Sequence, residues 1–213
     1  MTHPTLHGRD GGATRPSLLL ATRNPHKVSE IAALLAGLPV RVLSCADVPG
    51  IPEVVEDAPT LEGNAAKKAA AACAASGLPS LADDTGLEVE FLSGAPGVLS
   101  ARYAGDDATY DDNNRKLLSA LEGVPAPERR AVFRCVVAVA VPGRPVRLVE
   151  GRTEGTIIER PRGGGGFGYD PLFLPAGFER TYAEMTADEK NGVSHRGKAL
   201  RAARSLIEES LFA

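Results

Sequence analysis

Two adjacent acids, Asp83 and Asp84, follow a short apolar segment and precede Thr85 and Gly86. Adjacent side chains on an extended backbone point in opposite directions, so one acid can face a cleft while the other serves the structure. Carboxylates this close are costly unless a cation lies against them, and Mg²⁺ binds carboxylate, water and phosphate oxygens. A metal site is therefore one interpretation. An Asx-turn in which Gly86 supplies the bend is the other, and the four residues taken alone favour it.

The segment from Thr22 to Lys27 is a candidate phosphate site, because it joins a short apolar run to an amphipathic helix. A turn at a helix N-terminus exposes unpaired main-chain N–H groups and a partial positive charge. Thr22, Asn24 and Lys27 would add a hydroxyl, an amide and an ammonium group to it. Alternatively, Asn24 only caps the helix and Lys27 is solvated. No G-x-x-x-x-G-K-[ST] motif occurs, so the chain is not a P-loop enzyme.

A Pro-bounded acidic loop between Asp47 and Pro59 carries Glu53, Glu56 and Asp57. These carboxylates are further possible ligands for a hard cation. A charged loop of this kind is more often simply solvated, so the loop indicates little without other evidence.

The glycine run 163–166 is the most unusual stretch by composition, and Phe167, Tyr169 and Asp170 follow it at once. Glycines permit close approach of the main chain to a ligand, or a hinge. Phe167 could stack on a flat ring, and Asp170 could cap a turn or reach a ligand hydroxyl. A flexible loop leading into a core strand is an equally good interpretation.

Lys190 and the run Ser194-His195-Arg196 bracket the start of the last expected helix. Ser194 is suited to cap that helix, and the polar side chains after it would project from the helix mouth. A single histidine is usually structural, but an Arg next to it at a helix start makes an anion or base contact credible. No G-x-S-x-G or H-E-x-x-H motif occurs, so neither a serine hydrolase nor a zincin is indicated.

The overall composition is that of an ordinary folded protein. The 213 residues include 24 Lys and Arg against 27 Asp and Glu, and this net charge of −3 argues against broad nucleic-acid binding. No apolar run approaches the roughly 20 residues of a membrane helix, and the N-terminus lacks the apolar core of a signal peptide. Three widely spaced cysteines favour neither a disulfide framework nor a zinc knuckle, so a cytoplasmic location is expected.

An alternating α/β framework must bring these residues together. Strands are expected at 18–21, 40–43 and 87–92, and a hairpin is expected from 132–141 and 146–155. Helices are expected after residue 25 and at 61–75, 109–121 and 194–211. We therefore expect a mixed α/β fold with two lobes and a cleft between them. Residues 17–213 would form one two-lobed domain, and residues 1–16 a flexible extension.

Six segments in one order carry a resemblance to a known family. They are A-T-R-N-P-H-K-V-S-E at 21–30, T-L-E-G-N-A-A-K-K-A at 60–69, L-A-D-D-T-G-L at 81–87, G-A-P-G-V-L-S-A-R-Y-A-G at 94–105, G-G-F-G-Y-D-P-L-F at 165–173, and A-E-M…E-K-N…S-H-R-G at 183–197. The chain resembles the inosine/xanthosine triphosphate pyrophosphatases, the Ham1-like family that acts on non-canonical purine nucleoside triphosphates. The resemblance extends from Leu18 to the C-terminal helix.

The resemblance implies a two-lobed α/β fold with an elongated central mixed sheet, a homodimer and a requirement for Mg²⁺. It also implies that Asp84 is the catalytic base and a metal ligand. The positions that match substrate-binding residues of the family are Thr22, Arg23, Asn24, Pro25, His26, Lys27, Lys68, Thr85, Phe167, Gly168, Tyr169, Asp170, Lys190, His195 and Arg196.

The acidic loop departs from the family pattern. Many members carry two adjacent acids before the T-[FL]-E-x-N-A helix, and one of them is a metal ligand. Here the segment reads Val54-Val55-Glu56-Asp57, and Val55 takes the place of the first acid. Glu56 is then the candidate second metal ligand, with Asp83 as the alternative.

The implied activity is hydrolysis of ITP, dITP and XTP to the monophosphate plus pyrophosphate, which keeps deaminated purines out of DNA and RNA. Lys27, Lys68, Lys190 and Mg²⁺ would offset the charge of the triphosphate. Arg196 would donate to the 6-oxo group of the base, with Phe167 stacked on the ring. A sensor that binds nucleotides without hydrolysing them is the competing hypothesis, and Val55 gives it room. A nucleic-acid-binding module comes third.

Overall fold

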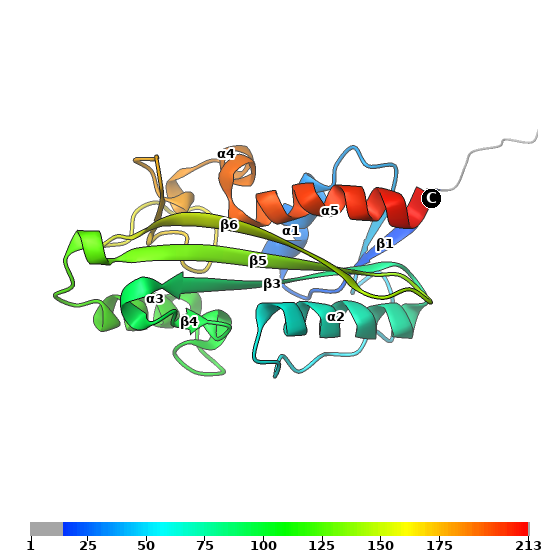
Figure 1. Cartoon of the computed structure of the whole chain (residues 1–213), viewed down its shortest axis with the longest axis horizontal. Coiled ribbons are helices and arrows are strands. Elements are labelled where there is room, and N and C mark those ends of the chain that lie inside the picture. Colours follow the sequence, from blue (N-terminus) through cyan, green and yellow to red (C-terminus); the bar gives the residue numbers. More distant parts are fainter. Residues whose placement is uncertain (1–14, 213) are drawn as a thin grey trace, which may run out of the picture.

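A computed structural model describes residues 15–212, and a mixed sheet of seven strands runs through the molecule (Figure 1). The strand order is β2-β1-β3-β5-β6-β7, and β4 pairs with β3. Strand β1 is parallel to β2 and β3, and the other pairs are antiparallel. Of the predicted extension, residues 1–14 lie outside the described part of the chain. The strands are β1 (Ser17–Leu20), β2 (Arg41–Ser44), β3 (Ser80–Val89), β4 (Pro96–Gly97), β5 (Arg130–Ala140), β6 (Arg147–Ile157) and β7 (Phe173–Pro175).

Helices α2 and α5 cover opposite faces of the long strands at one end of the molecule (Figure 1). The side chains of alternate residues of β5 lie on opposite faces of the sheet. Cys135, Val137 and Val139 pack with α5, whereas Val136 and Ala138 pack with α2. This burial on both faces explains why β5 is almost continuously apolar. The helices are α1 (Pro25–Leu34), α2 (Leu61–Ser76), α3 (Tyr110–Ala120), α4 (Ala187–Val193) and α5 (His195–Phe212).

A second apolar core forms the other end of the molecule, where α3 and β4 lie (Figure 1). It includes Leu87 of β3, Leu117 of α3, Phe133 of β5, Phe173 of β7 and Tyr182. Because β3 and β5 contribute to both cores, the same strands tie the two lobes together. The prediction of a mixed α/β fold is confirmed. Helix α4 was not predicted, since seven residues are too short for a periodic apolar pattern.

The D-D-T-G segment is not a turn. Strand β3 is continuous, and its pairing with β5 runs unbroken from Ser80↔Ala140 to Val89↔Ala131. The predicted break before residue 87 is therefore wrong, and so is the Asx-turn alternative. On its other edge, β3 pairs with β1 only at Ser80 and Leu81, and with β4 only at Leu87 and Glu88. Within residues 15–212 no strand covers this edge between 82 and 86.

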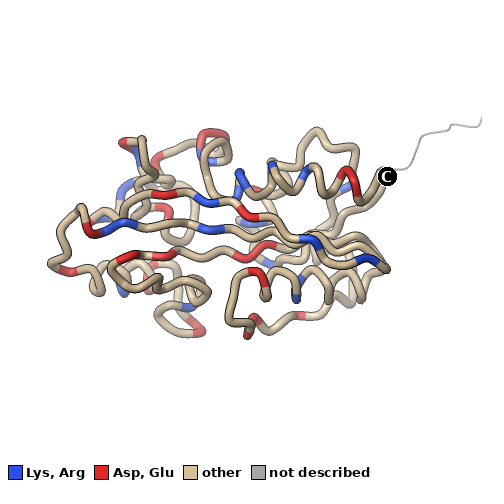
Figure 2. The backbone as a smooth tube through the Cα atoms, in the orientation of Figure 1, with Lys and Arg blue, Asp and Glu red and all other residues tan. Residues whose placement is uncertain are grey.

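The charged residues are mixed in sign along the whole chain. In the view of Figure 2, Lys and Arg are interspersed with Asp and Glu at both ends of the molecule. No helix in the described part of the chain has the length and apolar character to cross a membrane.

Close packing of α5 on β6 generates the first prediction. A Cβ at Gly151 of β6 would overlap the main-chain oxygen of His195 and the nitrogen of Ala199, at the start of α5. We expect Gly151→Ala to lower the free energy of unfolding by about 1–3 kcal/mol or more, because the helix must shift. Gly192→Ala in α4 is the matched control, since its Cβ would meet no atom within 4 Å. Urea denaturation checks both, and equal midpoints for the two variants would refute this packing argument.

Candidate active site

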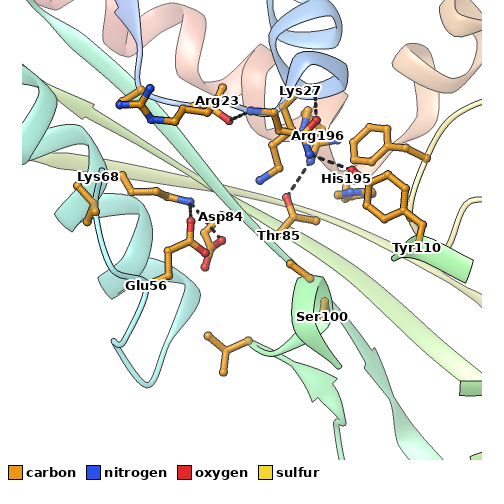
Figure 3. A pocket seen from close by; sticks show the side chains of 18 of the residues that line it. Arg23, Lys27, Glu56, Lys68, Asp84, Thr85, Ser100, Tyr110, His195 and Arg196 are labelled. Atoms are coloured by element: carbon orange, nitrogen blue, oxygen red, sulfur yellow. Dashed lines mark hydrogen bonds and ion pairs between the residues drawn. The ribbon is translucent and has the colours of Figure 1, made fainter. Parts of the chain in front are cut away.

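A cavity of about 310 Å³ lies beside the uncovered edge of β3, between the two lobes. Its walls come from the turn after β1, the loop before α2, β3, α3, the loop after β6 and the start of α5. Figure 3 shows charged side chains from these elements pointing toward one another. The predicted site residues that line the cavity are Thr22, Arg23, Asn24, Lys27, Glu56, Lys68, Asp84, Thr85, Phe167, Gly168, Tyr169, Asp170, Lys190, His195 and Arg196.

Asp84, Glu56 and Lys68 form one corner of the cavity, which we call the acidic corner (Figure 3). Lys68 Nζ lies 2.6 Å from Glu56 Oε1 and 3.4 Å from Asp84 Oδ1. The other oxygen of Asp84, Oδ2, is buried and has no hydrogen-bond partner among the described residues. Burial raises the pKa of Asp84, although Lys68 acts against it. Burial alone would lower the pKa of Lys68, but Asp84 and its acidic neighbours raise it, so this lysine stays charged.

The acidic corner fits a divalent cation. Its two carboxylates outnumber its one ammonium, and a buried carboxylate oxygen is costly unless a donor or cation meets it. Residues 15–212 contain no group of three or more His, Cys, Asp or Glu side chains placed to hold a metal. Mg²⁺ suits such a sparse site, because one or two carboxylates commonly hold it while water and substrate phosphates complete the octahedron.

Asp83 points to the opposite face of β3, as the alternation of side chains predicts. Its Oδ2 lies 3.1 Å from Lys27 Nζ and 3.1 Å from Arg196 Nη2, and it accepts a hydrogen bond from Thr85. Burial alone would raise the pKa of Asp83, but Lys27 and Arg196 hold it far below its usual range. Asp83 is fully buried and does not line the cavity. The Asp83 carboxylate therefore neutralises Lys27 and Arg196, and Glu56 is the better candidate for a second metal ligand.

The ion pairs continue from Arg196 toward the second lobe. Arg196 Nη1 lies 2.6 Å from Glu30 Oε2, and Lys190 Nζ lies 2.7 Å from Glu30 Oε1. Lys190 also pairs with Asp170. Burial raises the pKa of Asp170, although the positive charge of Lys190 acts against this. Signs alternate along this series, so the buried charges compensate one another. Glu30 was not predicted, because its partners Lys190 and Arg196 lie 160 and 166 residues away in the sequence.

In the turn before α1, the main-chain N–H groups differ from the prediction in their hydrogen bonding. Asn24 Oδ1 accepts hydrogen bonds from the N–H groups of His26 and Lys27, at 3.0 and 3.3 Å, and Pro25 has no N–H. The prediction of unpaired N–H groups is therefore wrong at these positions, because the cap already uses them. Lys27 is not solvated either, since its side chain is only 16% exposed and pairs with Asp83. The turn offers a phosphate mainly side chains.

Tyr110 lies across the cavity from the acidic corner (Figure 3), and it forms an aromatic cluster with Phe167 and His26. The His26 and Phe167 rings stack with their centroids 5.3 Å apart, and Tyr110 is tilted against both. Tyr110 Oη accepts a hydrogen bond from Asn24 Nδ2 at 3.1 Å, which joins the two lobes. Pro25 and His26 are the predicted site residues that do not line the cavity, so His26 supports Phe167 from outside.

Tyr110 was missed because only its helix was predicted. It is the first residue of α3, directly after the N-cap Thr109, which forms a capping box with Asp112. The capping box signals where the helix begins, but not that the first side chain faces a cleft. Ser100 also lines the cavity and was missed, although it lies within segment 94–105, which is one of the six that carry the family resemblance.

The comparisons with known proteins extend the resemblance from short segments to the domain. The family model described as the Ham1 family matches residues 18–206. The chain belongs to the Ham1 family. The match begins within β1 and ends within α5, so it includes every element of this Ham1-family protein that lines the cavity.

Two curated relatives carry the name dITP/XTP pyrophosphatase. The Geobacter sulfurreducens protein is 54% identical over 183 residues, which cover 86% of this chain and 92% of the relative. The Lactiplantibacillus plantarum protein is 46% identical over 199 residues, which cover 92% of this chain and 97% of the relative. The similarity therefore spans nearly the whole length of both relatives.

Solved structures agree in fold. The structure of a HAM1 protein from Coxiella burnetii has a TM-score of 0.82 at 39% identity, and the match covers 91% of this chain and 99% of that one. A Mycobacterium abscessus structure, titled nucleoside-triphosphatase / dITP/XTP pyrophosphatase, has a TM-score of 0.69 at 44% identity and covers 87% and 97%. The Ham1 assignment therefore rests on sequence and fold together.

His195 is buried against the core of the second lobe. It is 2% exposed, its ring stacks on Phe133 at 4.4 Å, and its Nδ1 has no partner among the described residues. Burial lowers the pKa of His195 well below its ordinary value, and the positive charge of Arg196 adds to this effect. The imidazole is therefore neutral at neutral pH and offers no positive charge to a phosphate.

This environment predicts a pH-dependent contribution to stability. Between the ordinary histidine pKa of about 6.5 and the lowered value, the unfolded chain binds a proton at residue 195 and the folded chain does not. The free energy of unfolding should therefore fall as the pH drops below about 6.5. We expect His195→Gln to lose less stability than the wild type between about pH 7.5 and about pH 5.

Urea denaturation across this pH range provides the measurement. His26→Gln is the control, because it makes the same substitution at an exposed residue. Parallel stability curves for the wild type and His195→Gln would show that His195 does not titrate differently in the folded state.

Proposed function

We propose that this chain hydrolyses non-canonical purine nucleoside triphosphates, namely ITP, dITP and XTP, to the monophosphate plus pyrophosphate. The reaction would remove deaminated purines from the nucleotide pool before polymerases use them. The observation that carries the proposal is Asp84, a buried carboxylate at one end of a cavity, whose Oδ2 has no partner within residues 15–212. Cations and an aromatic side chain line the rest of that cavity, and the curated relatives are named for this activity.

We assign Asp84 and Glu56 as the protein ligands of Mg²⁺. When bound, the ion would withdraw charge from the phosphate oxygens and complete its coordination with water and substrate. Lys68 then stands beside both carboxylates, where its charge can also meet a phosphate. The finding that supports the assignment is the surplus of negative charge in the acidic corner.

Hydrolysis of the α–β phosphoanhydride needs a water that loses a proton as it attacks. Asp84 accepts that proton while the new P–O bond forms and the bond to the pyrophosphate breaks. Asp84 Oδ2, which has no hydrogen-bond partner among the described residues, is the oxygen placed to accept the proton. Lys27 and Lys68 offset the charge of the triphosphate, and most of the rate enhancement comes from positioning and charge stabilisation.

The aromatic end of the cavity is suited to the base. Lys190 Nζ lies 4.9 Å from the centre of the Phe167 ring, so we assign Lys190 to the nucleoside rather than to the triphosphate. Within the described residues, acceptors take four of the five N–H groups of Arg196. The remaining one, on Nη1, can donate to the 6-oxo group of hypoxanthine or xanthine. An adenine 6-amino group cannot accept that bond, which costs the wrong substrate about 1–3 kcal/mol.

Val55 no longer supports a sensor without activity. Its side chain is 71% exposed and does not line the cavity, so an acid at this position would point into solvent. The adjacent Glu56 reaches the acidic corner instead. The departure from the family pattern at Val55 therefore leaves the proposed metal ligands intact.

The homodimer and the cytoplasmic location are parts of the same proposal. The homodimer rests on the family resemblance, and the cytoplasmic location rests on three widely spaced cysteines that are free thiols in the structure. Light scattering coupled to size exclusion measures the oligomeric state directly.

The activity is tested by pyrophosphate release from ITP, dITP, XTP, ATP and GTP, with and without Mg²⁺. We expect the inosine and xanthosine substrates to be preferred and the reaction to need the metal. Asp84→Asn should lower kcat by about 100-fold or more, because the amide cannot accept the proton. Glu56→Gln should raise the Mg²⁺ concentration needed for half-maximal rate, because one carboxylate ligand is lost.

Asp57→Asn is the matched control, since it makes the same carboxyl-to-amide change as Glu56→Gln, in the same loop. The Asp57 side chain is 67% exposed, and within residues 15–212 it forms an ion pair only with Lys67 at the surface, so the activity of this variant should equal that of the wild type. A wild-type protein that binds ITP but releases no pyrophosphate would favour the sensor. Full activity in Asp84→Asn would remove the assigned role of Asp84.

A further inference from the structure

One oxygen of Asp83 is shared by two cations from different parts of the fold. Asp83 Oδ2 lies 3.1 Å from Lys27 Nζ, and it accepts hydrogen bonds from Arg196 Nε and Nη2 at 3.2 and 3.1 Å. Thr85 Oγ1 also donates to Oδ2, at 3.1 Å. The other oxygen, Oδ1, is buried and has no partner among the described residues. More donors crowd onto Oδ2 than its two lone pairs can serve, so the two cations compete for it.

The two competing cations serve opposite ends of the proposed substrate. Lys27 comes from the first turn of α1, in the turn assigned to the triphosphate, and Asp83 is its only ion-pair partner in the described part of the chain. Arg196 comes from the start of α5, and its Cζ lies 5.4 Å from the centre of the Phe167 ring, at the base end. A single buried carboxylate is thus in contact with both recognition elements.

We propose that Asp83 is a positioning residue that couples triphosphate binding to base selection through Lys27 and Arg196. The inference rests on the proposed function. Lys27 holds Asp83 Oδ2 from one side, and this limits how far Arg196 is drawn toward the carboxylate and away from the cavity. Because Asp83 is fully buried, water does not screen the competition. Loss of Lys27 therefore moves the guanidinium toward Asp83 and weakens its contact with the 6-oxo group.

Lys68 offers a matched comparison. It is also a cavity lysine assigned to the triphosphate, and its side chain is about as buried as that of Lys27, at 12% and 16% exposed. Among the described residues, however, the ion pairs of Lys68 go to Glu56 and to Asp84 on the other face of β3, and none goes to Asp83. Loss of Lys68 removes a positive charge near the phosphates without touching the shared oxygen.

The experiment compares Lys27→Met with Lys68→Met by the ratio of kcat/KM for ITP to that for ATP. Both variants should lose activity. Only Lys27→Met should also lower the ratio, by about fivefold or more, the lower end of common coupling between sites. The preference for ITP is also measured at equilibrium, as the ratio of the dissociation constant of ATP to that of ITP without divalent metal. This second ratio does not depend on turnover. A ratio in Lys27→Met that stays at or above the wild-type value overturns the proposal.

Asp83→Asn completes a double-mutant cycle, and its folding is checked by circular dichroism. In the Asp83→Asn background, Lys27→Met should no longer change the ratio, because the shared carboxylate is gone. If Asp83→Asn does not fold, the two lysine variants still decide the question. Failure of the proposed function appears separately, as a wild-type protein that releases no pyrophosphate from ITP.

Discussion

The arrangement of the site depends on burying two neighbouring carboxylates on one strand. Asp83 and Asp84 project to opposite faces of β3, and each face must supply cations because a buried, uncompensated charge is very costly. The helices on the two faces provide them. Lys27 of α1 and Arg196 of α5 meet Asp83, and Lys68 of α2 meets Asp84. Helices α2 and α5, which cover the long strands, and α1, which packs on α5, thus also carry the cations that meet the two acids.

The cavity exists because β3 is longer than its neighbours on one edge. Strand β1 ends at Leu20 and β4 begins at Pro96, and the middle of β3 lies uncovered between their pairing sites. Substrate-sized space opens there without interrupting the sheet, because β5 supports β3 along its whole length on the other edge. The two lobes can therefore provide opposite walls of one cleft while sharing the same rigid strands.

The two carboxylates have different environments, which fit them for different work. Asp83 is surrounded by donors and stays ionised, so it acts as a fixed counter-charge. Asp84 has one lysine, one acidic neighbour and an oxygen without a partner in the described part of the chain, so it can accept a proton or bind a cation. Opposite shifts of the two pKa values are a known mark of functional carboxyl pairs. Adjacent positions in the sequence thus become a structural acid and a reactive one.

The sequence by itself determined the fold class, the long hairpin, the starts of α1, α2, α3 and α5, and most residues around the cavity. Apolar periodicity, caps and six ordered segments are local signals that survive in any tertiary context. It did not determine that D-D-T-G continues a strand, that Asn24 uses the N–H groups of its helix, that Glu30 pairs with Lys190 and Arg196, or that Tyr110 faces the cleft. Tertiary structure decided these, because cations from three distant helices remove the cost of keeping two acids extended within a sheet.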